Sequence, residues 1–187
     1  MVASLYFVYR AMEDAFDRSD NPNVKGLDVP ELRRLAALEK DMEYFYGQSW
    51  RDVKPSMATQ TYVSRIQAVA AEDPDLLVAH QYTRYLGDLF GGQMMSGMAV
   101  RSLGLKNREG VSFYDFQGIP DVKAFIERWY GFLNGLDISE EKKEAIVDEA
   151  NRVFSLNILI LEELDGNALL VVAKLVLGAF KEKVGLT

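Results

Sequence analysis

Apolar residues recur along most of the chain at intervals of three and four positions, with polar residues between them. This spacing places the apolar side chains on one face of an α-helix. Six segments show the pattern and are expected to form helices: residues 2–18, 28–47, 56–69, 76–104, 121–136 and 139–164. No stretch alternates between apolar and polar residues as a half-buried strand would. The sequence therefore predicts a single all-α domain over residues 1–187.

Residues that favour helix starts mark several of these boundaries. Asp28, Ser56 and Ser139 each precede an apolar pattern and carry a side-chain oxygen that can accept a hydrogen bond from the first turn. Two segments lack the pattern and are expected to be loops: residues 19–26 and residues 105–120. The longer loop contains aromatic residues that we expect to anchor it: Phe113, Tyr114 and Phe116.

The longest apolar run, residues 168–180, follows a break at Asp165-Gly166-Asn167 and is interrupted by Lys174. A helix needs about 20 apolar residues to span a bilayer, so this run is too short. We expect a buried or partner-facing terminal helix and no membrane anchor. Residue 1 leads directly into a helical pattern, without the basic segment and apolar core of a signal peptide.

The segment of residues 80–97, HQYTRYLGDLFGGQMMSG, carries four glycines inside a pattern that otherwise predicts a helix. Each glycine costs about 1 kcal/mol relative to alanine in a helix interior. Gly87 and Gly91 lie one turn apart, so they leave a bare strip of backbone on one face. Such a strip suits either close packing of another helix or contact with a flat ligand. Asp88 and Arg84 beside it favour the ligand, because a carboxylate can organise water and protons.

The composition excludes several kinds of site. The chain has no cysteine, so disulfides, thiolate nucleophiles and cysteine-bound zinc or iron–sulfur clusters are absent. It has one histidine, His80, whereas HExxH zinc sites and paired Glu-x-x-His di-iron sites need two or more. The net charge of −7, without a basic cluster, gives no sign of nucleic-acid binding.

Other residues of the glycine segment have a plainer interpretation. His80 precedes Gly87 by about two turns, roughly on the same face, and we expect it to be exposed or hydrogen-bonded rather than a metal ligand. Three methionines at helical spacing are expected in the core: Met94, Met95 and Met98. The glycine spacing fits neither a P-loop nor a dinucleotide-binding fingerprint, and no strand precedes it.

The stretch LLVAHQYTRYLGDLFGGQ closely resembles the distal-helix signature of the heme oxygenases, LLVAHxYTRYLGDLSGGQ. Three further segments resemble parts of the same family and follow the family order: ASLYFVYRAMED, PELRRLAALEKDMEYFYGQSW and VDEANRVFSLNILILEELDGN. The resemblance covers nearly all of the chain and includes the soluble cyanobacterial and algal members.

This resemblance implies an all-α protein that binds heme b between a proximal and a distal helix. With O2, and with electrons from a ferredoxin or a flavoprotein reductase, members of the family cleave heme to biliverdin, carbon monoxide and ferrous iron. The resemblance implies that Gly87 and Gly91 contact the heme face. It implies that Asp88 organises the water that delivers protons, and that Arg84 belongs to the distal hydrogen-bond network.

The resemblance also implies a set of heme-pocket residues. Tyr82 matches a tyrosine on the propionate side, and Tyr6 matches the tyrosine that reaches the water chain. Phe154 and Asn157 match pocket residues of a later helix. The family motif F-K-x-x-Y-R-x-x-M-N places a lysine and an arginine near the heme propionates. This chain has Ile126 and Tyr130 at those positions, which makes Tyr130 the remaining binding candidate there.

The family's iron-binding histidine lies on a helix upstream of the segment that ASLYFVY resembles, which is where this chain begins. The sequence therefore predicts an N-terminally incomplete domain that lacks the proximal helix and has no metal ligand of its own. His80 does not match the family's ligand. Phe90 also replaces a serine of the signature.

Three functions follow from these observations. The first is a heme oxygenase, and the second is a non-catalytic heme- or tetrapyrrole-binding protein on the same fold. The third is an all-α interaction module with a vestigial pocket. The retained motif, above all Asp88, favours the heme oxygenase over the interaction module. The missing histidine favours the non-catalytic heme-binding protein over the heme oxygenase. We expect a monomer in the cytoplasm, or in a plastid if a targeting segment precedes residue 1.

Overall fold

The computed structural model describes residues 1–163, and all regular elements among them are helical. The α-helices are α1 (Val2–Arg18), α2 (Pro22–Leu27), α3 (Leu35–Tyr46), α4 (Met57–Glu72), α5 (Leu77–Gln81), α6 (Gly87–Leu103), α7 (Val122–Asn134) and α8 (Glu140–Glu162). Short 3₁₀ turns lie at η1 (Pro30–Leu32), η2 (Gly47–Asp52), η3 (Pro74–Leu76) and η5 (Ser112–Tyr114), and η4 (Tyr82–Leu86) is a π-helix. The predicted terminal helix at residues 168–180 lies outside the described residues.

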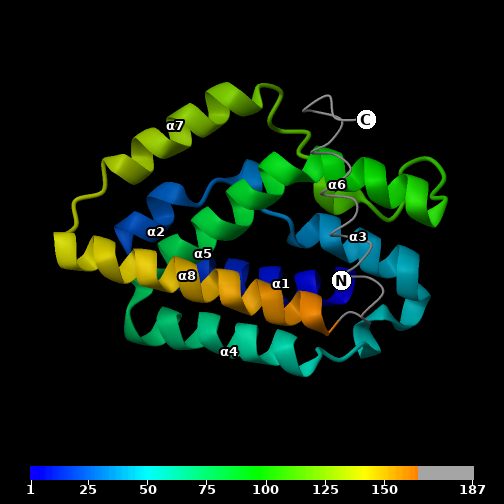
Figure 1. Cartoon of the computed structure of the whole chain (residues 1–187), viewed down its shortest axis with the longest axis horizontal. Coiled ribbons are helices and arrows are strands. Elements are labelled where there is room, and N and C mark those ends of the chain that lie inside the picture. Colours follow the sequence, from blue (N-terminus) through cyan, green and yellow to red (C-terminus); the bar gives the residue numbers. More distant parts are fainter. Residues whose placement is uncertain (164–187) are drawn as a thin grey trace, which may run out of the picture.

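Helix α1 lies at the centre of the fold, packed against α3 and α4 (Figure 1). Helix α8 crosses in front of α5 and also packs on α4. Helix α6 contacts the 3₁₀ turn η5. One face of α1 is buried along its whole length, at Leu5, Tyr9, Met12 and Phe16. These residues have the helical spacing that the sequence shows, so the first helical pattern supplies the centre of the core. Within residues 1–163, no helix is long and apolar enough to cross a bilayer.

Most of the predicted helices are confirmed. The Ser56 hydroxyl accepts a hydrogen bond from the Thr59 N–H at 3.2 Å, and the Ser139 hydroxyl accepts one from the Lys142 N–H at 3.1 Å. The prediction of a loop over residues 19–26 is wrong, because α2 forms there. The Asn21 side chain caps α2 by accepting hydrogen bonds from two of its N–H groups.

The predicted helix over residues 28–47 is interrupted. Its first part is the 3₁₀ turn η1, and the backbone at Arg33 is extended before α3 begins. The reason is a tertiary contact: the buried Glu13 carboxylate of α1 accepts the N–H groups of Arg34 at 2.6 Å and Leu35 at 3.0 Å. The Asp28 side chain binds the Arg33 guanidinium and does not cap the N-terminus of a helix. A side chain from another helix therefore sets the start of α3.

The long segment predicted over residues 76–104 is helical almost throughout, and it ends at Gly104, which adopts the left-handed conformation typical of a helix C-terminus. The π-helical segment η4 separates α5 from α6. A π-helical turn contains one residue more than an α-helical turn, so the segment changes the relative rotation of the two helices.

Residues 105–120 connect α6 to α7, as the sequence predicts, with only a 3₁₀ turn among them. The buried Asp41 carboxylate of α3 accepts the N–H groups of Ser112 and Phe113, each at 2.8 Å. These bonds hold the connection against α3. The aromatic side chains of Phe113 and Tyr114 are thereby placed beside α1 and α6.

Replacing Asp41 by alanine is expected to destabilise the protein by about 2–4 kcal/mol, because two buried N–H groups lose their acceptor. Urea unfolding followed by far-UV circular dichroism measures the change. Asp14→Ala is the control, since Asp14 is an exposed carboxylate on α1 and its loss is expected to change stability by less than about 0.5 kcal/mol. Equal unfolding midpoints for the two variants would show that the Asp41 contacts do not hold the loop.

Candidate functional site

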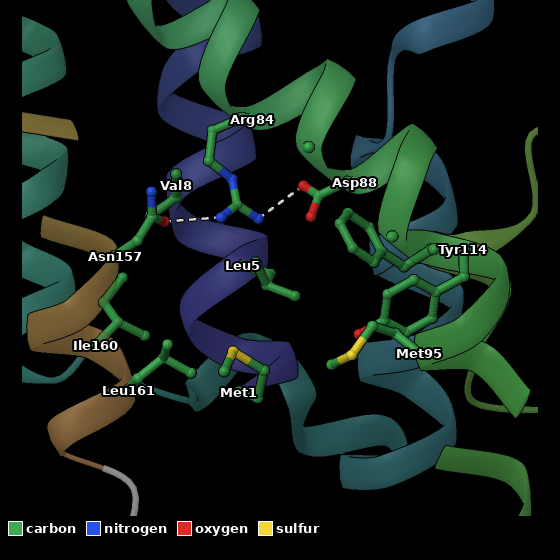
Figure 2. A pocket seen from close by; sticks show the side chains of 14 residues that line it. Met1, Leu5, Val8, Arg84, Asp88, Met95, Tyr114, Asn157, Ile160 and Leu161 are labelled. Carbon is green, nitrogen blue, oxygen red and sulfur yellow. Dashed lines mark hydrogen bonds and ion pairs between the residues drawn. The ribbon is translucent and has the colours of Figure 1, made fainter. Parts of the chain in front are cut away.

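A cavity of about 150 Å³ lies between α1, α6, α8 and the connection around η5 (Figure 2). Most of its lining is apolar and comes from Met1, Leu5, Val8, Met95, Phe113, Tyr114, Ile160 and Leu161. The glycines Gly87, Gly91 and Gly92 contribute bare backbone. Polar side chains gather at one end, where Arg84, Asp88 and Asn157 converge. The cavity is therefore an apolar space with one charged end.

Gly87 and Gly91 both face open space. A Cβ atom built on either residue has no other described atom within 4 Å, apart from neighbouring backbone of its own helix. Gly92 differs, because its Cβ would lie 3.4 Å from Cδ1 of Tyr114. Close packing against the η5 connection therefore explains why residue 92 is a glycine. It does not explain the glycines at positions 87 and 91. The bare strip of α6 borders the cavity.

Two side chains bind Asp88, and a third binds one of those two. The Arg84 guanidinium donates a hydrogen bond to Oδ2 of Asp88 at 2.7 Å and another to Oδ1 of Asn157 at 2.7 Å (Figure 2). The Tyr9 hydroxyl of α1 donates to the same Asp88 oxygen. Neither bond uses Oδ1 of Asp88, so this oxygen can accept a hydrogen bond from water in the cavity.

Burial is the largest influence on the pKa values of Asp88 and Tyr9. Loss of solvent raises the pKa of Asp88 above its ordinary value, and Arg84 and the Tyr9 hydroxyl counteract part of that rise. Burial also raises the pKa of Tyr9, and the neighbouring carboxylate raises it further, so the hydroxyl stays protonated and donates. Asp88 is consequently a carboxylate with a higher proton affinity than an exposed aspartate, held in place by two donors.

Two buried polar atoms beside this group have no partner among the described residues: the Tyr62 hydroxyl of α4 and Nε of Arg84. Burial raises the pKa of Tyr62, so its hydroxyl stays protonated. Buried polar groups without protein partners commonly bind ordered water. The arrangement therefore has places for water next to Arg84 as well as next to Asp88.

The structure brings five of the predicted site residues together at the cavity, namely Arg84, Gly87, Asp88, Gly91 and Asn157. Three others do not line it. Tyr82 stacks on Trp129, with 6.4 Å between ring centroids, and its ring lies 6.3 Å from that of Tyr130. Phe154 is 54% exposed on α8.

Tyr6, also predicted as a site residue, does not line the cavity either. Its ring packs against Phe7 and Trp50, and it does not reach Asp88. Tyr9 makes that contact, because the inward face of α1 carries Leu5, Tyr9 and the residues spaced from them by three or four positions. A tyrosine on an otherwise apolar helix face has a hydroxyl that needs a buried partner, and this signal could have identified Tyr9 and Tyr62 from the sequence.

His80 is fully buried, and its Nε2 atom lies 3.1 Å from Oε1 of Glu149, so the expectation of a hydrogen-bonded histidine is confirmed. The chain's only imidazole is thus not part of the cavity lining. The three methionines expected in the core differ from one another. Met98 is buried, Met94 is 46% exposed, and Met95 lines the cavity.

A model of the heme oxygenase family matches residues 1–163. Heme oxygenase 1 of Nostoc sp. strain PCC 7120 is 40% identical over 98% of this chain and 78% of its own length. Heme oxygenase 1 of Synechocystis sp. strain PCC 6803 is 46% identical, over 89% of this chain and 70% of its own length. The crystal structure of heme oxygenase-1 from Synechocystis sp. PCC6803 in complex with heme gives a TM-score of 0.85 at 43% identity. That match covers 96% of this chain and 81% of the other. The chain therefore belongs to the heme oxygenase family of enzymes.

Proposed function

We propose that this protein binds heme as its substrate and cleaves it, with O2 and external electrons, to biliverdin, carbon monoxide and ferrous iron. The observation that carries the proposal is the partly buried Asp88 carboxylate, fixed beside the bare backbone of Gly87 and Gly91. The first feature serves proton delivery, and the second admits a flat ligand to within contact distance of the helix. The solved relative in complex with heme supports the same substrate.

The residues that border the cavity fit a porphyrin on this side. Gly87 and Gly91 would contact its face, and the apolar side chains of Leu5, Val8 and Met95 line the space beside it. The cavity of about 150 Å³ is smaller than the roughly 300–1,000 Å³ of pockets for drug-sized ligands. We therefore infer that it is the space for O2 and water on the distal side, with heme at its open boundary. Bound heme supplies the iron that activates O2.

Asp88 would act on protons and not on iron. Arg84 and Tyr9 both bind Oδ2, which fixes the carboxylate and leaves Oδ1 free to bind water. Because burial raises the pKa of Asp88, the carboxylate can hold a proton more readily than an exposed aspartate and return it to a water molecule. The Asn157 side chain holds the other side of the Arg84 guanidinium, so the donor to Asp88 cannot swing away.

We further propose that a ferredoxin or a flavoprotein reductase supplies the electrons, in the cytoplasm or in a plastid. The chain itself has no cysteine with which to bind an iron–sulfur cluster. An external electron carrier is therefore the simplest source, and each turnover would require its transient docking.

A second candidate function is heme or tetrapyrrole binding without cleavage. Two observations favour it. The only histidine of the chain, His80, is buried and bonded to Glu149, so it is not available to iron. Ile126 and Tyr130 also take the positions where the family motif places its cationic residues. In this case the pocket would hold the ligand, and the Asp88 network would stabilise water beside it.

Titration of the purified protein with hemin distinguishes the two candidates. The proposed function predicts a Soret band that shifts and saturates, followed by biliverdin and carbon monoxide when ascorbate or a ferredoxin system is added in air. Saturable binding without biliverdin would support the second candidate. No Soret shift on hemin addition would refute both functions.

Replacing Gly91 by alanine is expected to stabilise the protein without heme and to weaken its binding of hemin. The empty protein should gain up to about 1 kcal/mol, because alanine favours the helix and the new methyl meets no neighbour. Hemin affinity should fall about tenfold or more, equivalent to at least about 1.4 kcal/mol, because the methyl occupies the ligand's contact surface. Gly26→Ala in α2 is the matched control, with equal space for its methyl and no contact with the cavity. Unchanged hemin affinity in Gly91→Ala would contradict the proposed contact.

Asp88→Ala is expected to keep hemin binding within about threefold but to lower the biliverdin yield by at least about a hundredfold, the usual size of a proton-transfer contribution. Peroxidase-like oxidation of added guaiacol should rise at the same time, since oxidising equivalents are no longer directed to the porphyrin. Product spectra and guaiacol oxidation measure the two effects. A biliverdin yield equal to that of the unmodified protein would refute the proton-delivery role.

A further inference from the structure

A second buried polar cluster lies outside the cavity and joins α4, α5 and α8. Its centre is the Glu149 carboxylate of α8, which is 3% exposed. Nε of Arg65 on α4 lies 2.9 Å from Oε1 of Glu149, and a second nitrogen of the same guanidinium binds Oε2. Nε2 of His80 on α5 lies 3.1 Å from Oε1. One carboxylate thus receives donors from two other helices.

Burial and hydrogen bonding act in opposite directions on the pKa values of Glu149 and His80. Burial alone would raise the pKa of Glu149, but the bonds from His80 and Arg65 lower it to about 2, so the carboxylate is ionised at neutral pH. Burial lowers the pKa of His80, which is therefore neutral. Because a carboxylate only accepts, Nε2 of His80 carries the proton and donates it. Nδ1 is then an unprotonated acceptor, and it is buried without a partner among the described residues.

The same stretches of chain that form this cluster also supply the groups around Asp88. Each contributes one residue to the cluster and a second residue one or two turns away on the same stretch. The pairs are Arg65 and Tyr62 on α4, His80 and Arg84 on α5 and η4, and Glu149 and Asn157 on α8. The cluster and the site are therefore two layers of contacts between the same helices.

We propose that Glu149, His80 and Arg65 are positioning residues that set the register of α4, α5 and α8, and thereby place Arg84 between Asp88 and Asn157. Apolar contacts between helices tolerate small shifts along the axis, because they have no required direction. The cluster requires donors and acceptors to meet within hydrogen-bond distance and direction. The effect on catalysis rests on the proposed function, whereas the effect on Arg84 geometry does not.

The primary test uses the full chain without heme and follows the Arg84 guanidinium by NMR. In the unmodified protein, its hydrogen-bonded protons should exchange slowly with solvent. Glu149→Gln removes the charge and one acceptor oxygen at nearly constant volume, and we expect exchange at Arg84 to accelerate at least tenfold. Ile66→Ala on α4 is the control, since it removes buried apolar contacts beside Arg65 but no polar partner. It should lower the urea midpoint at least as much, yet change Arg84 exchange by less than threefold.

A second pair of variants keeps the test decisive if Glu149→Gln does not fold. His80→Gln places an N–H donor near the position of Nε2 and should preserve slow Arg84 exchange, whereas His80→Leu should lose it. Unchanged exchange in Glu149→Gln, or equal exchange in the two His80 variants, would overturn the proposal. If exchange accelerates in Glu149→Gln but the unmodified protein forms no biliverdin, the positioning role stands and only the catalytic function is refuted.

Discussion

The partly buried ion pair between Arg84 and Asp88 is the interaction on which the rest of the site depends. Removing two charges from water is expensive, and the cost is recovered only when further hydrogen bonds satisfy both groups. Tyr9 from α1 donates a second hydrogen bond to the carboxylate, and Asn157 from α8 accepts a second hydrogen bond from the guanidinium. Because these partners lie on helices far apart in sequence, the pair can be stable only in the assembled fold. The need for hydrogen-bond partners on both charged groups therefore links the position of the Asp88 carboxylate to the packing of the whole molecule.

Buried carboxylates recur in the same structural role elsewhere in the fold. Glu13 accepts the first N–H groups of α3, and Asp41 accepts two N–H groups of the η5 connection. Glu149 accepts donors from α4 and α5. Each is an acidic side chain on one element that fixes the start or position of another. The excess of acidic over basic residues is consequently not only a feature of the surface, since part of it holds the helices in place.

Local patterns in the sequence predicted what depends on local physics. The apolar periodicity identified the long helices, and Ser56 and Ser139 marked two helix starts. The glycines and Asp88 of the predicted site line one cavity in the structure. The patterns failed where a distant side chain decides the outcome. The interruption before α3 depends on Glu13, and the choice of Tyr9 over Tyr6 depends on which face of α1 meets α6. Neither contact leaves a trace in the local spacing of residues.

The π-helical segment η4 has a consequence for the chemistry that the ligand would meet. In an uninterrupted α-helix, His80 and Gly87 would lie about two turns apart on nearly the same face. The wider turn at residues 82–86 breaks this alignment, so His80 faces Glu149 while Gly87 borders the cavity. A single additional residue in one turn thus separates the chain's only imidazole from its ligand surface. A ligand bound at this cavity would therefore meet a carboxylate, a phenol and bare backbone, but no imidazole from this helix that could bind iron and exclude O2.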